Sequence, residues 1–175
     1  SSRMLSYQKM LGQLQDAGNA TTLAHYLRLL GEAGLVAGIE KYYDEPVRAK
    51  ASSPKLAVCN MALMTAMLPY GFDELRARHD PWGRVFESAV CAHLMSSCRR
   101  KNIQLRYWNV GNKEVDFVLQ KGDRIAALEV KSADADSVSG MKEFKARHPL
   151  AKPYLIGGQG MAAERFFTCE VAELV

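Results

Sequence analysis

Two carboxylates and one amine stand in this sequence at a spacing that two neighbouring strands could bring together. Twelve residues separate Asp116 from Glu129-Val130-Lys131. Converging carboxylates suit a hard cation such as Mg²⁺ or Mn²⁺. A bound cation can polarise a phosphate and lower the pKa of an attacking water. The pattern predicts a metal site with Asp116, Glu129 and the carbonyl of Val130 as ligands, in which Lys131 orients the water or stabilises charge on phosphate oxygens.

A further carboxylate, Glu87, comes from the helix that precedes these strands. Asp80 as N-cap and Pro81 in the first position predict a helix that runs to about residue 97. Glu87 lies at the edge of the apolar stripe of this helix, so we expect it to reach the metal through a water molecule. His93 lies within the stripe and is expected to be a core residue.

The elements around these residues alternate between strand and helix. We expect strands at residues 103–108, 114–119 and 125–131, a helix at 140–148 and a strand at 153–156; residues 166–175 could form a last strand or a tail. Period-two alternation predicts that Val115, Phe117 and Leu119 face one way and Asp116 the other. In the next strand, Glu129 and Lys131 would share a face.

The same residues have a plainer interpretation, a surface hairpin with a Glu129–Lys131 charge pair and an unrelated Asp116. Charged residues alternate on many exposed strands, so the spacing alone is weak. Here Val and Leu flank each charged position, which is typical of central strands, where unpaired charge is costly. Together with Glu87 on the leading helix, this context favours a functional site.

The first third of the chain has a winged-helix pattern. We expect helices at residues 7–14 and from Thr21 or Thr22 to about 33, then a strand at 35–39, a turn at 44–46 and a basic return strand. Residues 56–68, which are rich in Met, are expected to be buried core.

Five residues of this region are candidate nucleic-acid contacts. Thr21, His25 and Arg28 would enter a DNA groove, while Arg48 and Lys50 of the hairpin would touch phosphate. The alternative is a winged helix used for packing or protein contacts. The exposed helix face offers only His25 and Arg28 for contacts to DNA bases or phosphates, which favours that alternative.

The composition sets broad limits. The chain of 175 residues has 23 Lys and Arg against 19 Asp and Glu, a mildly basic balance that permits a nucleic-acid partner without requiring one. The four cysteines form no C-x-x-C pair, which argues against a zinc site. No apolar run reaches the roughly 18 residues of a membrane span, so we expect no membrane partner and a cytoplasmic location with reduced thiols. The opening Ser1-Ser2-Arg3-Met4 suggests a fragment of a longer chain.

These motifs resemble a known family. Glu87, Asp116 and Glu129-Val130-Lys131 resemble the PD-(D/E)xK nuclease superfamily, and nearly the whole chain resembles the C-terminal domain of a family of uncharacterised prokaryotic AAA-type ATPases. The matching stretches are QDAGNATTLAHYL (15–27), SSPKL (52–56), WGRVFESAV (82–90), YW (107–108), EVDFVL (114–119) and EVK (129–131).

The resemblance implies an α/β (α+β) fold, with a winged-helix-like segment at residues 1–69 and a restriction-endonuclease-like αβββαβ core at 70–175. It also implies an N-terminal ATPase domain in the same parent chain. The present sequence contains no G-x-x-x-x-G-K-S/T, so it cannot hydrolyse ATP by that route. Asn109 stands where an Arg often follows the Tyr-Trp pair, which removes one phosphate contact. The expected function is a metal-dependent nuclease-like module that hydrolyses or binds DNA. The alternative is a catalytically silent DNA-binding or protein-interaction module; the sequence leaves substrate and oligomeric state open.

Overall fold

A mixed sheet forms the centre of the molecule. The computed structural model describes all residues except 1–2, 5–11, 13–17, 44–53 and 133–138. Within that part of the chain, seven strands pair in the order β1-β3-β2-β4-β5-β6-β7. They are β1 (Arg3–Met4), β2 (Val36–Lys41), β3 (Lys55–Val58), β4 (Gln104–Val110), β5 (Lys113–Lys121), β6 (Arg124–Val130) and β7 (Lys152–Ile156). β4, β5 and β6 are antiparallel neighbours, whereas β2–β4 and β6–β7 are parallel pairs.

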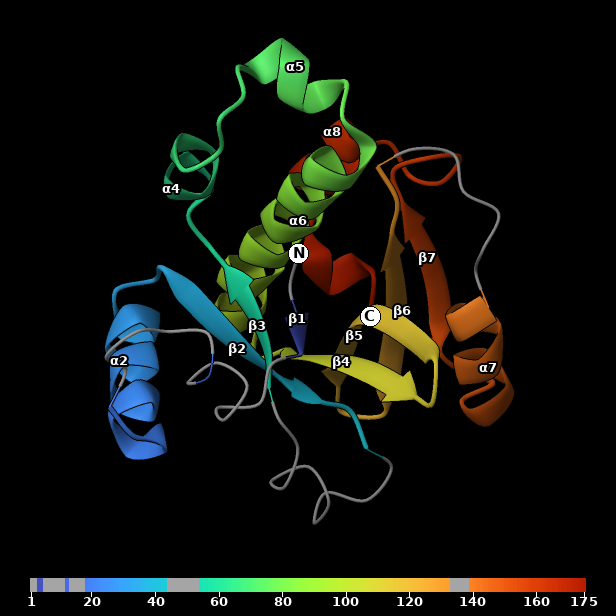
Figure 1. The fold of residues 1–175 in the computed structure, drawn as a ribbon. Coiled ribbons are helices and arrows are strands. Elements are labelled where there is room, and N and C mark those ends of the chain that lie inside the picture. The colour runs from blue at the N-terminus through green and yellow to red at the C-terminus, as the bar shows by residue number, and fades with distance from the viewer. Residues whose placement is uncertain (1–2, 5–11, 13–17, 44–53, 133–138) are drawn as a thin grey trace.

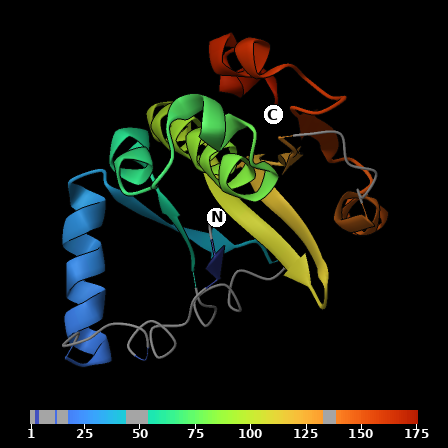
Figure 2. The same cartoon turned by 45° about the horizontal axis from the view of Figure 1, so that its top comes forward.

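Helices cover both faces of this sheet (Figures 1 and 2). They are α2 (Ala20–Glu32), α4 (Met61–Ala66), α5 (Phe72–Arg76), α6 (His79–Lys101), α7 (Ser139–Arg147) and α8 (Ala163–Thr168), with a 3₁₀ turn η1 (Val171–Glu173). One core joins α6, α8 and η1 to the sheet, and includes Phe117, Leu119, Leu128 and Val130. The other lies under α7 and includes Val115, Val118 and Ala127. Apolar residues on both faces make β5 and β6 central strands, as predicted.

The second half of the chain follows the predicted element order, with two corrections. α6 begins at His79 with Arg78 as N-cap, so Asp80 lies in the first turn rather than at the cap. Pro81 is tolerated there because first-turn amides have no partner within the helix. Residues 166–175 form the end of α8 and η1, neither a strand nor a loose tail. Phe166 is fully buried, so this segment closes the core beneath α6.

β5 does not keep strict period-two alternation. Trp108 pairs with Val115 and Arg106 with Val118, so Tyr107 alone lies opposite Asp116 and Phe117. This register shift adds one residue to β5, as in a β-bulge. Val115 therefore packs under α7 with Val118, while Phe117 packs under α6. The prediction that Val115 and Phe117 share a face was wrong because the extra residue reverses the alternation at Asp116.

The N-terminal region contains the predicted helix and hairpin. Asn19 caps α2 by accepting a hydrogen bond from the Thr22 backbone N–H at 3.0 Å, so the predicted cap at Thr21 or Thr22 was wrong. β2 and β3 form the antiparallel hairpin, but β2 also pairs with β4. One sheet thus runs across the predicted boundary between residues 69 and 70, and the two-domain division stays a prediction. The predicted helix at 7–14, except Gly12, and the predicted turn at 44–46 lie outside the described residues.

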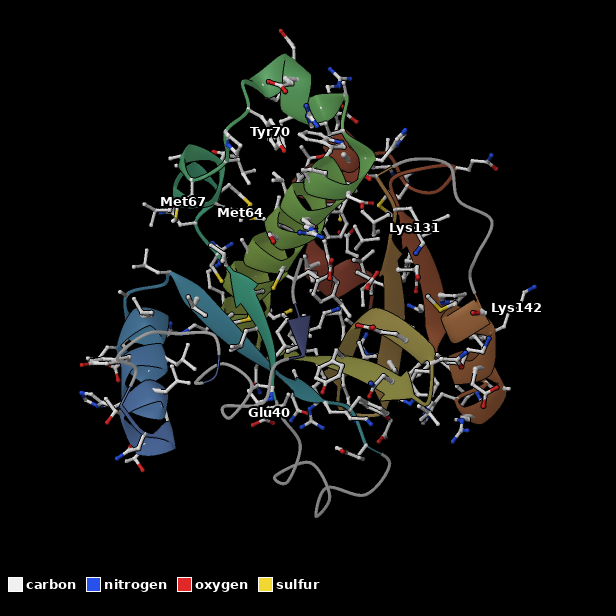
Figure 3. The ribbon with its side chains drawn as sticks, in the orientation of Figure 1. Glu40, Met64, Met67, Tyr70, Lys131 and Lys142 are labelled. Atoms are coloured by element: carbon white, nitrogen blue, oxygen red, sulfur yellow. The ribbon has the colours of Figure 1, made fainter. Side chains whose placement is uncertain are left out.

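The prediction that residues 56–68 are buried core holds for Ala57 in β3 but was wrong for the Met-rich residues 61–68, none of which is buried. α4 has no buried residue, and Met67 is 86% exposed. Figure 3 shows Met64 and Met67 at α4, on the side of α6 remote from β7. In the part of the chain that the structure describes, no helix combines the length and apolar character that crossing a bilayer requires.

Candidate functional site

The predicted acidic residues converge on a lysine that the prediction did not include. Lys55, the first residue of β3, is 2% exposed. Its Nζ donates to Oε1 of Glu114 at 2.9 Å and lies 3.1 Å from Oε1 of Glu87 and 3.5 Å from Oδ1 of Asp116. The ring centroid of Phe117 lies 5.6 Å from the same nitrogen. One buried ammonium group thus joins α6 and β5 to the N-terminal hairpin.

The remaining predicted residues form a second, adjoining pair. Lys131 Nζ lies 2.9 Å from Oε1 of Glu129, whose other oxygen, Oε2, is buried and has no hydrogen-bond partner. Asp116 connects the two groups, because its Oδ2 accepts a hydrogen bond from the Val130 backbone N–H at 2.8 Å. We call Glu87, Glu114, Asp116 and Glu129 the acidic cluster. It contains all the predicted carboxylates, together with Glu114.

Burial and charge shift the pKa values of the cluster. Burial raises the pKa of Asp116 to about 7; Lys55 opposes this shift, whereas Glu87 and Glu129 add to it. Burial also raises the pKa of Glu129, against the attraction of Lys131. For Lys55, burial alone would lower the pKa, but Asp116, Glu87 and Glu114 outweigh it and raise the pKa. Lys55 is therefore charged at any physiological pH, and one carboxyl group of the cluster titrates near neutrality.

The arrangement does not fit the predicted Mg²⁺ or Mn²⁺ site. Mg²⁺ needs oxygen ligands at about 2.0–2.1 Å in octahedral geometry. One oxygen each of Glu87, Glu114 and Asp116 lies against Lys55, and the second oxygen of Asp116 accepts the Val130 N–H. Among the described residues, no group of three or more His, Cys, Asp and Glu side chains could hold a metal ion. Only Oε2 of Glu129 is an unused buried carboxylate oxygen there.

Lys131 also borders a groove of about 660 Å³, which we call the Lys131 groove. Its cationic and aromatic lining comes from α5, α6 and the end of β6: Phe72, Arg76, His79, Trp82, Phe86 and Lys131. Phe72 is 65% exposed and meets Trp82 edge to face, with ring centroids 6.1 Å apart. Glu164 is the acidic residue of the lining. Figure 3 places Lys131 at the end of β6 near the start of α6, beside β7.

The predicted nucleic-acid residues do not join this site. Thr21, His25 and Arg28 are exposed on α2, which lies at the end of the sheet opposite β7 (Figure 1). Arg28 pairs with Glu32 at 2.7 Å and with Nδ1 of His25 at 3.3 Å. Arg48 and Lys50 fall outside the described residues. His93, expected to be a satisfied core residue, is half-buried and its Nε2 has no hydrogen-bond partner among the described residues; its ring centroid lies 5.3 and 5.5 Å from those of Phe166 and Phe167.

Sequence reasoning did not include two residues of the site, Lys55 and the cluster residue Glu114. Glu114 had a usable signal, because it is two residues from Asp116 in a strand. Lys55 lies in the SSPKL stretch and on the basic return strand, but neither its spacing nor the alternation of residues links it to Asp116 or Glu129. Its role depends on the pairing of β3 with β2 and of β2 with β4, which are contacts distant in sequence.

Comparisons with known proteins assign the second half of the chain to a domain family. The family described as "Domain of unknown function (DUF4143)" matches residues 82–169, from the first turns of α6 to the end of α8. No curated protein and no solved structure matches the chain. The match spans Glu87, Glu114, Asp116, Glu129 and Lys131 but not Lys55. Since it covers half of the 175 residues, the chain belongs to the DUF4143 domain family.

Proposed function

We propose that this chain is a nuclease-like module that binds nucleic acid in the Lys131 groove without cutting it, as the C-terminal part of a cytoplasmic AAA-type ATPase. Domains of this family commonly occur in proteins associated with such ATPases, which supports an ATPase domain as the partner of this chain. The order of α6, β4–β6, α7 and β7 agrees with a restriction-endonuclease-like core. The winged-helix-like assignment of the first 69 residues belongs to the same proposal.

The composition of the groove is the observation that carries the binding role. Arg76 and Lys131 supply positive charge, and a phosphate backbone is attracted by such groups whatever its base sequence. Phe72 presents an exposed ring, and an unpaired base can stack on it, with a contribution of about 1–3 kcal/mol per base. Cations beside an exposed aromatic ring favour single-stranded nucleic acid over a duplex, whose bases are already stacked.

Fluorescence anisotropy with labelled single-stranded and duplex oligonucleotides tests this role. We expect the single strand to bind more tightly, and affinity to fall as salt increases. Arg76→Ala and Phe72→Ala should each weaken binding by roughly tenfold, the loss of one phosphate or stacking contact. Arg28→Ala, which removes an exposed arginine from α2, should leave affinity unchanged.

Three outcomes would redirect the proposal. A loss confined to Arg28→Ala would move the interface to α2 and support the groove-reading helix of a winged-helix domain. Absence of binding to either oligonucleotide would favour a protein-interaction module, for which Leu63 and Met67 on α4 offer exposed apolar side chains. Tighter binding to duplex would remove the stacking role of Phe72.

Metal-dependent cleavage of DNA is the second candidate. It is favoured by the convergence of Glu87, Asp116, Glu129 and Lys131, since carboxylates beside a lysine are the groups that phosphodiester hydrolysis with Mg²⁺ or Mn²⁺ would use. It is opposed by Lys55, whose ammonium group contacts three of the four cluster carboxylates. The binding role therefore ranks first.

A further inference from the structure

Lys55 is a buried cation with an unusually complete set of partners. A lysine side chain that is 2% exposed is destabilising unless its charge is paired and its donors are satisfied. An ammonium group has three N–H donors. Here three carboxylates lie within 3.5 Å of the nitrogen, one from α6 and two from β5. The site is thus built around a cation, and the chain itself supplies it.

In the described part of the chain, carboxylates outnumber lysines at the acidic cluster. Its four carboxylates are paired there with two ammonium groups, Lys55 and Lys131. The Glu129 side chain is only 10% exposed, and its Oε2 is buried without a hydrogen-bond partner among the described residues. Both observations describe an environment with the charge and the oxygen ligands of a divalent-cation site.

The position of Lys55 blocks that use. An ammonium nitrogen and a divalent cation compete for the same carboxylate oxygens, and Lys55 already holds one oxygen each of Glu87, Glu114 and Asp116. β3 is fixed by pairing on both sides, with β1 and with β2, so Lys55 enters from a strand held in the sheet. The ring of Phe117 covers the nitrogen further.

We propose that Lys55 is the resident cation of the acidic cluster, that it excludes divalent metal from the native site, and that removing its charge creates a metal site. The hairpin β2–β3 thereby determines which cation the DUF4143 core holds. This inference does not depend on the nucleic-acid role, because it concerns metal binding alone and is read out without any oligonucleotide.

The experiment compares Mn²⁺ binding by the wild-type chain and Lys55→Met, which keeps an unbranched side chain only one atom shorter and removes its charge. The loss of the free Mn²⁺ signal in electron paramagnetic resonance measures binding directly. We expect no tight uptake by wild type, and one equivalent bound by Lys55→Met at least roughly tenfold more tightly, since the carboxylates then lack a counter-ion. Thermal unfolding should show Mn²⁺ raising the Tm of Lys55→Met and not that of wild type.

Two further variants make the comparison specific. Lys41→Met removes a lysine from the same hairpin but outside the cluster, and should behave as wild type. The double variant Lys55→Met/Asp116→Asn should lose the Mn²⁺ bound by the single variant. If the wild-type chain binds one equivalent of Mn²⁺ and Asp116→Asn abolishes that binding, the proposal is overturned, whatever the Lys55 variant does.

The folding of Lys55→Met is itself informative. If it is unfolded in chelator, saturating Mn²⁺ should restore its folded circular-dichroism signal, because the metal takes the place of the lost ammonium group. A variant that folds and binds no Mn²⁺, or one that stays unfolded with saturating Mn²⁺, would show that the cluster cannot accept a divalent cation, and would overturn the second half of the proposal.

Discussion

The Asp116 carboxylate accepts a hydrogen bond from the backbone N–H of Val130 at 2.8 Å, so that the side chain of β5 is fixed against the last residue of β6. Regular pairing of these strands begins only beyond this point, at Phe117 and Leu128. The contact holds Asp116 between Lys55 on one side and the Glu129–Lys131 pair on the other. Its protonation therefore affects the whole acidic cluster.

The first prediction concerns pH. The pKa of Asp116 is raised from 3.8 to about 7 by burial, with the charges of Glu87 and Glu129 adding to the shift and Lys55 opposing it. The folded chain binds this proton more tightly than the unfolded chain. The contribution of Asp116 to the free energy of unfolding is therefore fully present below its pKa in the unfolded chain and is lost as the pH rises through about 7. Between these values, this group makes the unfolding free energy fall as pH rises, by at most about 1.4 kcal/mol per pH unit.

Denaturant titrations at several pH values between the two pKa values measure this slope. Asp116→Asn, which cannot ionise, should flatten it. A slope that Asp116→Asn leaves unchanged would assign the titration to another group, with Glu129, whose pKa is also raised by burial, the next to vary.

The second prediction concerns the stability that Lys55 provides. Lys55→Ala leaves Glu87, Glu114 and Asp116 without their shared cation, and we expect it to lower the unfolding free energy by about 3–5 kcal/mol, as for one partner of a buried ion pair. Lys101→Ala is the matched control. Its pair with Glu170 is half exposed, so its loss should cost about 1 kcal/mol or less. Equal effects of the two substitutions in urea unfolding would contradict a central role for Lys55.

The third prediction concerns the approach of α7 to β5. A Cβ at Gly140 would overlap the backbone carbonyl oxygen of Glu114, which must then move together with its side chain and the Lys55 contact. We expect Gly140→Ala to destabilise the fold by about 1–3 kcal/mol or more, the usual effect of overpacking. Gly31→Ala in α2 is the control, because its Cβ meets only the Val36 oxygen at an ordinary 3.5 Å and alanine favours helix. Thermal unfolding of the two variants should give Tm shifts of opposite sign.

The fourth prediction concerns cleavage. With Lys55 among the carboxylates, we expect the wild-type chain to leave single-stranded and duplex DNA intact in Mg²⁺ or Mn²⁺. Electrophoresis of DNA incubated with wild type and with Glu129→Ala provides the test. Metal-dependent cutting by wild type that Glu129→Ala abolishes would establish the nuclease alternative and place Glu129 in the active site. Cutting that persists in Glu129→Ala would instead indicate a contaminating nuclease.

Local sequence was sufficient for much of the second half of the chain. The alternation of apolar residues predicts β6 with Leu128 and Val130 in the core beneath α6, because period two is a property of any strand. The predicted strands are separated at Gly111 and Gly122, which have positive φ of 58° and 60°, a conformation that glycine adopts without a steric penalty. The residue types of Asp116, Glu129 and Lys131 were enough to expect that they would cluster.

The tertiary structure decided what that cluster contains. Sequence periodicity has no means of showing the extra residue in β5, which places Phe117 on the opposite face of the sheet from Val115, because a bulge depends on pairing with β4. It also has no means of showing Lys55, which reaches Glu114 from 59 positions earlier through the pairing of β3, β2 and β4. By itself, then, the sequence determined that carboxylates and a lysine would meet at β5 and β6. Only the three-dimensional pairing of strands distant in sequence determined that a lysine ammonium, rather than an open space for metal, lies between them.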